Sequence, residues 1–355
     1  MLTVPAYPAE ISSPKVTIAV TGCTGYVAGS IVQRLLVLGH TVHGTCRDPK
    51  KADALKALPG GQERLKLFTS DLMKSGSFDE AFTGCQYVVH CASPYTTNCP
   101  KHLAKERIIT PAIQGTENVI SSVNKVPTIK RVVLTSSCAA VYGNPTERGA
   151  GHVFDEEDWA LAPTETVLPY FYSKREAEKR AWALAEQQSR WDLIVINPPG
   201  IFGPPVTDRA DGTSLDIIKQ IMAGRASPAC PDLGLGWVDV RDVAAAHSLA
   251  LFTPTAKGRY VCSAGSTRFA ELARTVAELF PTRVTPPSMT VPKWLLWLVG
   301  PLAGVPRDMV NNSVGLPGPA FSSEKIKKEL GLTFLDFSTM LQDQVRTMTD
   351  LKLIA

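Results

Sequence analysis

The chain has 355 residues, of which 44% are hydrophobic and 20% charged, and its formal net charge is +4 at pH 7. This length can bury a large core, and so small a net charge does not support nucleic acid as a partner. The eight cysteines show neither paired Cys-x-x-Cys spacing nor a Cys/His cluster. We therefore expect buried thiols, no bound metal and a reducing, cytoplasmic compartment. The N-terminus lacks the basic and apolar regions of a signal peptide.

The first predicted strand, residues 16–20, leads into a glycine-rich turn and then a helix. Gly22, Gly25 and Ala28 have the spacing Gly-x-x-Gly-x-x-Gly/Ala. These residues permit a sharp turn, a close approach of backbone to a pyrophosphate, and packing of the helix on the strand. The free N–H groups at the helix start favour an anion. We predict a dinucleotide site here, rather than a turn without a ligand, formed by Gly22, Thr24, Gly25, Tyr26 and Val27.

The second predicted strand, residues 41–46, ends at Arg47. An NAD-binding unit usually carries an acid here that holds the ribose hydroxyls, whereas arginine suits a 2′-phosphate. Asp48 follows, and Lys50 and Lys51 add positive charge nearby. We therefore predict that Arg47 selects NADPH (NADP+) as the cofactor; the alternative is a solvated charged turn.

The third and fourth predicted strands, residues 65–68 and 87–92, supply further cofactor contacts. Asp71 and Leu72 follow the third strand, where a carboxylate can accept from the adenine amino group while leucine packs on the ring. Asp71 is equally compatible with a turn cap. Ala92 ends the fourth strand and is small enough to leave room for the middle of the cofactor. We expect His90, within this apolar strand, to be a core histidine.

The fifth predicted strand, residues 131–137, ends in Thr135, Ser136 and Ser137. Ligands of open parallel sheets bind beyond the carboxyl ends of the strands. We therefore expect Thr135 to contact the cofactor and Ser137 to hold a substrate carbonyl oxygen, with Ser136 as the less favoured alternative for the second role.

A helical run begins near Pro169 and places Tyr170 and Lys174 on one face, because residues i and i+4 are neighbours on a helix. A lysine beside a tyrosine stabilises the phenolate and lowers the pKa of the phenol from its usual value near 10. Such a phenol can exchange a proton with a substrate oxygen near neutral pH. Tyr-x-x-x-Lys is a short motif that also arises by chance. The alternative interpretation is that both residues lie on the surface without a catalytic role.

The rest of the chain completes the predicted fold. The sixth strand, residues 193–196, runs into a proline-rich turn that should place Pro198 and Ile201 beside the nicotinamide. The apolar segment Val291–Val305 is too short to span a bilayer. It is interpreted as a core helix that lines the substrate pocket, in preference to a patch that meets a membrane or a second subunit.

Strands alternating with helices predict an α/β fold. We expect a Rossmann-like, doubly wound parallel sheet with a smaller, mainly C-terminal substrate lobe. The NADP-binding domain should comprise residues 1–203 with 236–266, and the lobe residues 204–235 and 267–355. The apolar composition of the lobe favours an apolar or aromatic carbonyl or alcohol as the substrate. The oligomeric state stays open, with a homodimer as one alternative.

The chain resembles the extended short-chain dehydrogenases/reductases, and among them the dihydroflavonol reductase and cinnamoyl-CoA reductase group. The resemblance covers most of the chain and rests on VTGCTGYVAGSIVQRLL, GTCRDP, TSDL, GSFDEAF, HCASP, QGTENV, RVVLTSS, PYFYSKREAEKRAW, INPPGIFGPP, WVDVRDVAAAH, GRYVCSA and SEKIKKELGL. It implies an NADPH-dependent carbonyl reductase in which Ser137, Tyr170 and Lys174 are catalytic and Arg47 contacts the 2′-phosphate. The same resemblance leaves two other enzymes open, a sugar-nucleotide epimerase/dehydratase and a hydroxysteroid dehydrogenase. An NADP(H) sensor without turnover is the alternative of another class.

Two departures separate the chain from named substrates of the group. Cinnamoyl-CoA reductases typically carry Asn-Trp-Tyr-Cys-Tyr-x-Lys where this chain has LPYFYSK. Plant dihydroflavonol reductases place an asparagine shortly after the serine, at a position that corresponds here to Tyr142, with Asn144 close by. The resemblance therefore indicates the reaction class and not the substrate.

Overall fold

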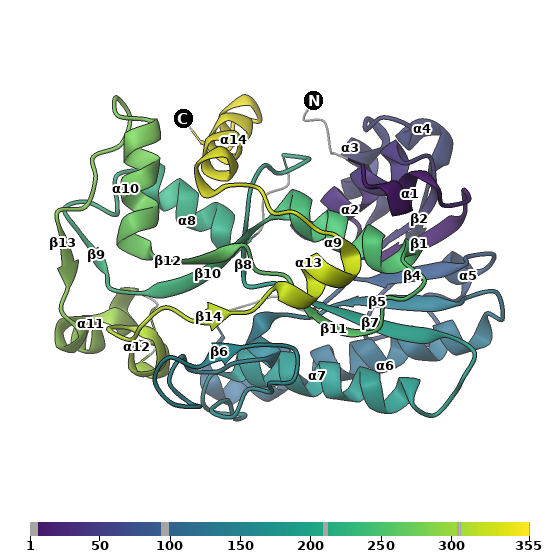
Figure 1. The fold of residues 1–355 in the computed structure, drawn as a ribbon, viewed down its shortest axis with the longest axis horizontal. Helices are drawn as coiled ribbons and strands as arrows, with labels where there is room; N and C mark the ends of the chain where they lie inside the picture. The colour runs from purple at the N-terminus through teal and green to yellow at the C-terminus, as the bar shows by residue number, and fades with distance from the viewer. Residues whose placement is uncertain (1–5, 94–98, 209–211, 304, 306, 355) are drawn as a thin grey trace.

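The computed structural model describes residues 6–93, 99–208, 212–303, 305 and 307–354. Its centre is a seven-stranded parallel sheet with the strand order β11-β7-β5-β4-β1-β2-β3 (Figure 1). These strands are β1 (Thr17–Thr21), β2 (Thr41–Cys46), β3 (Leu65–Thr69), β4 (Tyr87–His90), β5 (Arg131–Thr135), β7 (Asp192–Asn197) and β11 (Gly258–Val261). The strand order reverses between β1 and β4, which is where doubly wound sheets bind ligands. The predicted fold is confirmed.

Helices cover both faces of this sheet, and the side chains of each strand alternate between the two faces. Ile18 and Val20 pack with α2 (Tyr26–Val37) and α9 (Val240–Phe252), whereas Ala19 packs with α6 (Thr110–Lys125) on the opposite face. The helix α7 (Pro169–Ala185) lies beside α6 (Figure 1). A strand buried on both faces reads as a continuous apolar run, as the centres of β1, β5 and β7 do.

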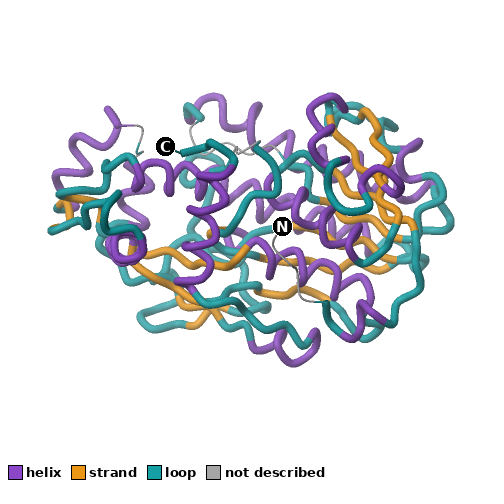
Figure 2. Tube along the Cα trace, turned by 90° about the horizontal axis from the view of Figure 1, so that it is seen from above, coloured by secondary structure: helices purple, strands orange, loops and turns teal. Residues whose placement is uncertain are grey.

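A smaller lobe follows β7 and surrounds a core of its own. Its sheet has the order β12-β10-β8, in which β10 (Gly234–Asp239) pairs parallel with β8 (Gly200–Phe202) and antiparallel with β12 (Gly265–Arg268). The helices α8 (Thr213–Met222), α10 (Phe269–Leu279) and α14 (Phe337–Asp350) pack around it. In the view of Figure 2 the large sheet and this lobe lie one after the other along the long axis.

The remaining elements are short. The strand β9 (Ala229–Pro231) pairs with β13 (Met289–Val291), and β14 (Ala320–Phe321) pairs with β6 (Val153–Phe154). The other α-helices are α1 (Pro8–Ile11), α3 (Asp53–Lys56), α4 (Gly61–Arg64), α5 (Asp79–Phe82), α11 (Lys293–Val299), α12 (Arg307–Ser313) and α13 (Glu324–Leu330). The remaining helical turns are η1 (Pro49–Ala52), η2 (Lys101–Leu103), η3 (Lys105–Ile109), η4 (Cys138–Ala140) and η5 (Gly300–Ala303).

The helix α11 corrects one expectation. The segment Val291–Val305 was expected to join the core, but no residue of α11 is buried. Large apolar side chains of this segment are exposed instead, namely Trp294 (69%), Trp297 (41%), Leu298 (57%), Val299 (41%) and Leu302 (91%). The core interpretation is therefore wrong. None of the helices in the described parts of the chain has the length and apolar character that crossing a bilayer requires.

Candidate active site

The glycine-rich turn joins β1 to α2 in the manner that a dinucleotide site requires. Gly22 has a φ of +66°, and a Cβ added to it would lie 3.1 Å from atoms of Ala92, at the end of the neighbouring β4. Gly25 caps the N-terminus of the 12-residue helix α2 and is exposed. Ala28 is 1% exposed and packs in the core. The backbone at the start of α2 is therefore accessible, which is the arrangement that a pyrophosphate cradle requires.

Hydrogen bonds hold the two strand ends at this cradle together. The Thr21 Oγ1 atom accepts the backbone N–H groups of Cys91 and Ala92 at 3.1 and 3.0 Å, and lies 2.9 Å from His90 Nδ1. His90 is buried, and its burial lowers the pKa of the imidazole to about 3. His90 thus occupies the core position that was expected for it, as a neutral ring that supports the site.

The three remaining residues of the predicted turn differ in their contacts. The Tyr26 hydroxyl donates to the Gly203 carbonyl at 2.7 Å, and its burial raises the pKa of the phenol well above the usual value. Tyr26 therefore ties the start of α2 to the segment after β8. Val27 packs on the core that α2 shares with the sheet, and Thr24 is half-buried. Contacts of Thr24, Tyr26 and Val27 with a cofactor stay predictions.

The end of β2 presents Arg47 to solvent. Arg47 is exposed and makes no hydrogen bond or ion pair with another described residue. The neighbouring Asp48 accepts the backbone N–H of Lys50 at 3.1 Å and so caps the short turn η1. The acid next to Arg47 is thus occupied, while the guanidinium is accessible, which fits the predicted contact with a 2′-phosphate.

Asp71 and Leu72 lie where the third strand ends. The Asp71 carboxylate is exposed and accepts the Met73 N–H at 2.9 Å, so it does cap a turn. Leu72 packs closely against Gly115 of α6, where an added Cβ would be 3.1 Å from the leucine. The turn-cap alternative therefore describes the contacts of Asp71, and its adenine contact stays a prediction.

The two serines at the end of β5 have different surroundings. The Ser136 hydroxyl is buried and donates to Glu178 Oε2 at 2.5 Å. Ser137 is half-buried, accepts the Ala139 N–H at 3.1 Å as the cap of η4, and lies 3.4 Å from the Pro198 carbonyl. The Ser137 hydroxyl is thus the less buried of the two, and its contact with a substrate stays a prediction.

Tyr170 and Lys174 lie on successive turns of α7, as their spacing predicted. The helix begins after Leu168, which has a φ of +53°, and packs against η4 beside Ser137. The Lys174 Nζ atom is 5.8 Å from the centroid of the Tyr170 ring. A cation at this distance from a phenol favours the phenolate.

A small cavity of about 20 Å3 adjoins Lys174. This volume suffices for about one water molecule. Burial lowers the pKa of Lys174 to about 8, and the nearby Cys91 and Glu178 act in the opposite direction. The described residues that line the cavity are His90, Ala92, Ser93, Thr116, Leu134, Thr135, Ser136, Lys174, Ala177 and Glu178.

Ala92 connects the two halves of the site. It contacts Gly22 of the dinucleotide turn and also lines the cavity beside Lys174. Thr135 lines the same cavity, and its hydroxyl is held inward by His247 Nε2 at 2.7 Å and Cys91 Sγ at 3.1 Å. The glycine turn, Thr135 and Lys174 are therefore brought together at the carboxyl ends of β1, β4 and β5.

The proline-rich turn after β7 packs behind Ser137. Pro198 is buried, and its carbonyl accepts the Cys138 N–H at 2.9 Å. Ile201 is half-buried in β8 and packs on the core. Their placement beside the nicotinamide stays a prediction.

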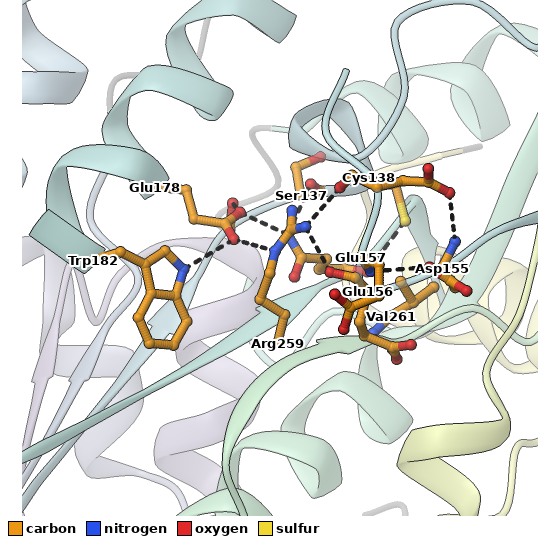
Figure 3. Close-up of polar contacts among 12 residues, drawn as sticks. Ser137, Cys138, Asp155, Glu156, Glu157, Glu178, Trp182, Arg259 and Val261 are labelled. Atoms are coloured by element: carbon orange, nitrogen blue, oxygen red, sulfur yellow. Dashed lines mark hydrogen bonds and ion pairs between the residues drawn. The ribbon is translucent and has the colours of Figure 1, made fainter. Parts of the chain in front are cut away.

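The structure adds a group of residues that was not predicted, centred on Glu178. Its buried carboxylate accepts from Ser136 at 2.5 Å, from Asn197 Nδ2 at 2.8 Å and from Arg259 Nε at 2.6 Å. Figure 3 shows the Arg259 guanidinium between Glu178 and the segment at residues 155–157. This hub joins α7 to the ends of β5 and β7 and to β11, and so sets the position of Lys174 one turn earlier. The sequence contains one indication of this hub. Glu178 follows Lys174 by four residues, as Lys174 follows Tyr170, so all three lie on one face of the helix.

Comparison with known proteins identifies the family. Residues 18–262 match the NAD dependent epimerase/dehydratase family. The chain belongs to this family. A cinnamoyl-CoA reductase of Medicago truncatula is 38% identical over 277 residues, which are 76% of this chain and 82% of that protein. A dihydroflavonol 4-reductase of Gerbera hybrida is 34% identical over 287 residues, which are 78% of this chain and 76% of the relative.

Solved structures agree with this assignment. Yeast methylglyoxal/isovaleraldehyde reductase Gre2, complexed with NADPH, superposes with a TM-score of 0.79 at 26% identity, covering 96% of this chain and 100% of that one. The predicted resemblance to the dihydroflavonol reductase and cinnamoyl-CoA reductase group is confirmed. The predictions of an oxidoreductase and of NADP(H) as its cofactor are confirmed at the level of this family.

Proposed function

We propose that the chain is an NADPH-dependent carbonyl reductase that converts a ketone or aldehyde into an alcohol. The observation that carries this proposal is the junction at Ala92, where the dinucleotide turn and the Lys174 cavity meet one helical turn from Tyr170. A pyrophosphate at the start of α2 would direct the rest of a dinucleotide toward the carboxyl ends of β4 and β5. Proton donor, cation and cofactor would then share one edge of the sheet.

Each side chain has a defined task in this reaction. The bound nicotinamide supplies the hydride that reduces the carbonyl carbon. Ser137 donates a hydrogen bond that orients the carbonyl oxygen, and Tyr170 gives its proton to that oxygen as the charge develops. Lys174 stabilises the remaining phenolate and holds the nicotinamide ribose. The product oxygen carries the tyrosine proton, and solvent returns a proton to Tyr170 before the next turnover.

An aromatic or apolar substrate is proposed from the side chains around this edge. Tyr142 packs against Phe154, Phe171 and Phe321, with ring centroids 5.1 to 5.8 Å apart, and Phe171 also packs edge-on against Tyr170. Phe154 is fully buried, whereas the other three phenyl or phenol rings are half-buried, and a site bordered by them would favour an apolar compound over a charged one. Asn144 accepts from Thr146 at 2.8 Å and donates to Asn312 at 3.3 Å, so its amide is engaged within the protein. This argues against Asn144 as the recognition group for flavonoid hydroxyls.

The test combines a substrate screen with one substitution. NADPH oxidation is followed with methylglyoxal, isovaleraldehyde, cinnamoyl-CoA, a dihydroflavonol and simple aromatic ketones. Tyr170→Phe should then lower kcat with the best substrate by about 10²–10⁴-fold, the usual contribution of a general acid. Binding of NADPH, measured by fluorescence titration, should be retained.

Tyr172→Phe is the matched control, because this phenol lies on the same helix and packs under Arg175. It should leave turnover unchanged. A full rate in Tyr170→Phe would refute the role of the phenol. NADPH binding without turnover across the screen would favour a sensor, and a clear preference for NADH would contradict the role of Arg47.

A further inference from the structure

An exposed apolar surface lies on the lobe, outside the site described above. We call it the α11 patch and define it as Trp294, Trp297, Leu298, Val299 and Leu302. The side chains come from α11 and from η5 immediately after it, so they are contiguous along the chain. Exposed apolar patches of this kind on a globular protein mark surfaces that meet a partner or a membrane.

Two cations, Lys293 and Arg307, flank the α11 patch along the chain. The nearest carboxylate in the sequence is that of Asp308, which is buried. The Arg307 guanidinium lies 4.3 Å from the centroid of the Trp297 ring, and the Lys293 ammonium donates to the Asn311 carbonyl at 3.2 Å. Both cations therefore flank the apolar side chains, where they can reach anionic groups at the edge of a buried apolar surface.

The α11 patch is tethered to the start of the helix that carries Tyr170. Asp308 of α12 is buried and accepts the Leu168 N–H at 3.2 Å, and Asn312 of the same helix bonds Asn144 at 3.3 Å. The helix α11 packs against α12, and Figure 1 shows the two helices together at one end of the lobe. The patch thus belongs to the same side of the molecule as the N-terminus of α7.

We propose that the α11 patch docks the protein onto an anionic lipid surface, with its tryptophans at the level of the headgroups. Tryptophan is enriched at membrane interfaces because its ring is apolar and its N–H is polar. Cations beside an apolar face add attraction to anionic lipids. A second copy of the chain fits less well, since a symmetric contact would bring Lys293 and Arg307 toward like charges. An apolar carbonyl compound dissolved in the lipid would then enter the protein from the membrane side.

The experiment measures cosedimentation of the full-length protein with sucrose-loaded vesicles. One set is phosphatidylcholine, and the other contains phosphatidylserine in addition. The wild type should sediment with the anionic vesicles, and raising the salt concentration should weaken this binding because salt screens the cations. Leu298→Glu should reduce the bound fraction at least tenfold while NADPH binding stays at the wild-type level.

Leu161→Glu is the matched control, because Leu161 is exposed to the same extent as Leu298, 57%. It introduces the same charge elsewhere and should leave vesicle binding unchanged. Three results would overturn the proposal: no sedimentation of the wild type, equal losses in both variants, or a wild-type dimer that Leu298→Glu converts to a monomer. The readout is binding to lipid, so it is independent of whether the proposed reductase activity is found.

Discussion

Two neighbouring turns of α7 contrast in how their charges are compensated. At Glu178, three hydrogen bonds of 2.5 to 2.8 Å satisfy a fully buried carboxylate, and one of them comes from a guanidinium. At Lys174, one turn earlier, burial lowers the pKa of the ammonium to about 8, and it makes no hydrogen bond or ion pair within the described part of the chain. The turn with Glu178 is organised for stability, whereas the turn with Lys174 keeps a charge in an environment that disfavours it.

This contrast shows where the protein accepts an energetic cost. A buried charge is tolerated when it is paired, and an unpaired one shifts its pKa toward neutrality. Perturbed groups in a cavity are typical of functional sites. In the proposed mechanism Glu178 supplies the rigid attachment and Lys174 the chemistry, so the hub would hold the lysine in place without neutralising it.

Lys174→Met tests the functional turn and should have the largest effect. Loss of the cation should lower kcat/KM by about 10²–10⁴-fold, because the Tyr170 phenolate is no longer stabilised. The unfolding temperature without cofactor should not fall, since methionine fills the space without a charge. Lys179→Met, on an exposed position of the same helix, is the control and should leave the rate unchanged. An active Lys174→Met enzyme would show that the Lys174 turn has no catalytic role.

Glu178→Ala tests the structural turn. It leaves Arg259, Ser136 and Asn197 without their acceptor and should lower the free energy of unfolding by about 3–5 kcal/mol. Chemical denaturation followed by circular dichroism measures this. Glu186→Ala, which removes an exposed carboxylate at the end of α7, should change the free energy of unfolding by less than about 0.5 kcal/mol. Similar losses in the two variants would show that the hub is not the anchor of this helix.

Arg47→Ala extends the comparison to the other end of the site. A hydrogen-bonded charge pair contributes about 1.5–3 kcal/mol, so the Kd for NADPH should rise about tenfold to a hundredfold. The Kd for NADH should stay nearly constant, because NADH lacks the 2′-phosphate. Lys51→Ala removes a neighbouring exposed charge and should have a smaller effect. An equal rise in the Kd for NADPH and the Kd for NADH would contradict a contact between Arg47 and the 2′-phosphate.

The pH dependence should be the smallest effect, and it has opposite signs for activity and stability. The value of kcat/KM should fall as the pH rises through about 8, where Lys174 loses its charge. The folded pKa of Lys174 lies below the unfolded value of 10.5, so its contribution to stability is present above pH 10.5 and is lost as the pH falls toward 8. Rate profiles and denaturation curves over this range measure both, and the stability component should disappear in Lys174→Met. The ionisable side chains near Lys174 are Tyr170, Glu178, His90 and Cys91.

Local patterns in the sequence were sufficient for the glycine turn and for the pairing of Tyr170 with Lys174. A turn with a positive φ at Gly22 and a helical i, i+4 pair depend on residues close together in the chain. The parallel sheet could also be predicted, because apolar strands that alternate with helices have few possible topologies. These features could be predicted since their physical causes are short-ranged.

Tertiary structure alone decided which groups these local elements meet. Ser136 and Ser137 are adjacent and chemically identical, and only the position of Glu178 turns one hydroxyl into the core. Arg259 is 81 residues from Glu178, and no local rule pairs them. The exposure of α11 is of the same kind, because an apolar helix is buried only if another element covers it. The sequence by itself determined the elements and their chemistry, whereas long-range packing determined which polar groups are satisfied and which remain accessible.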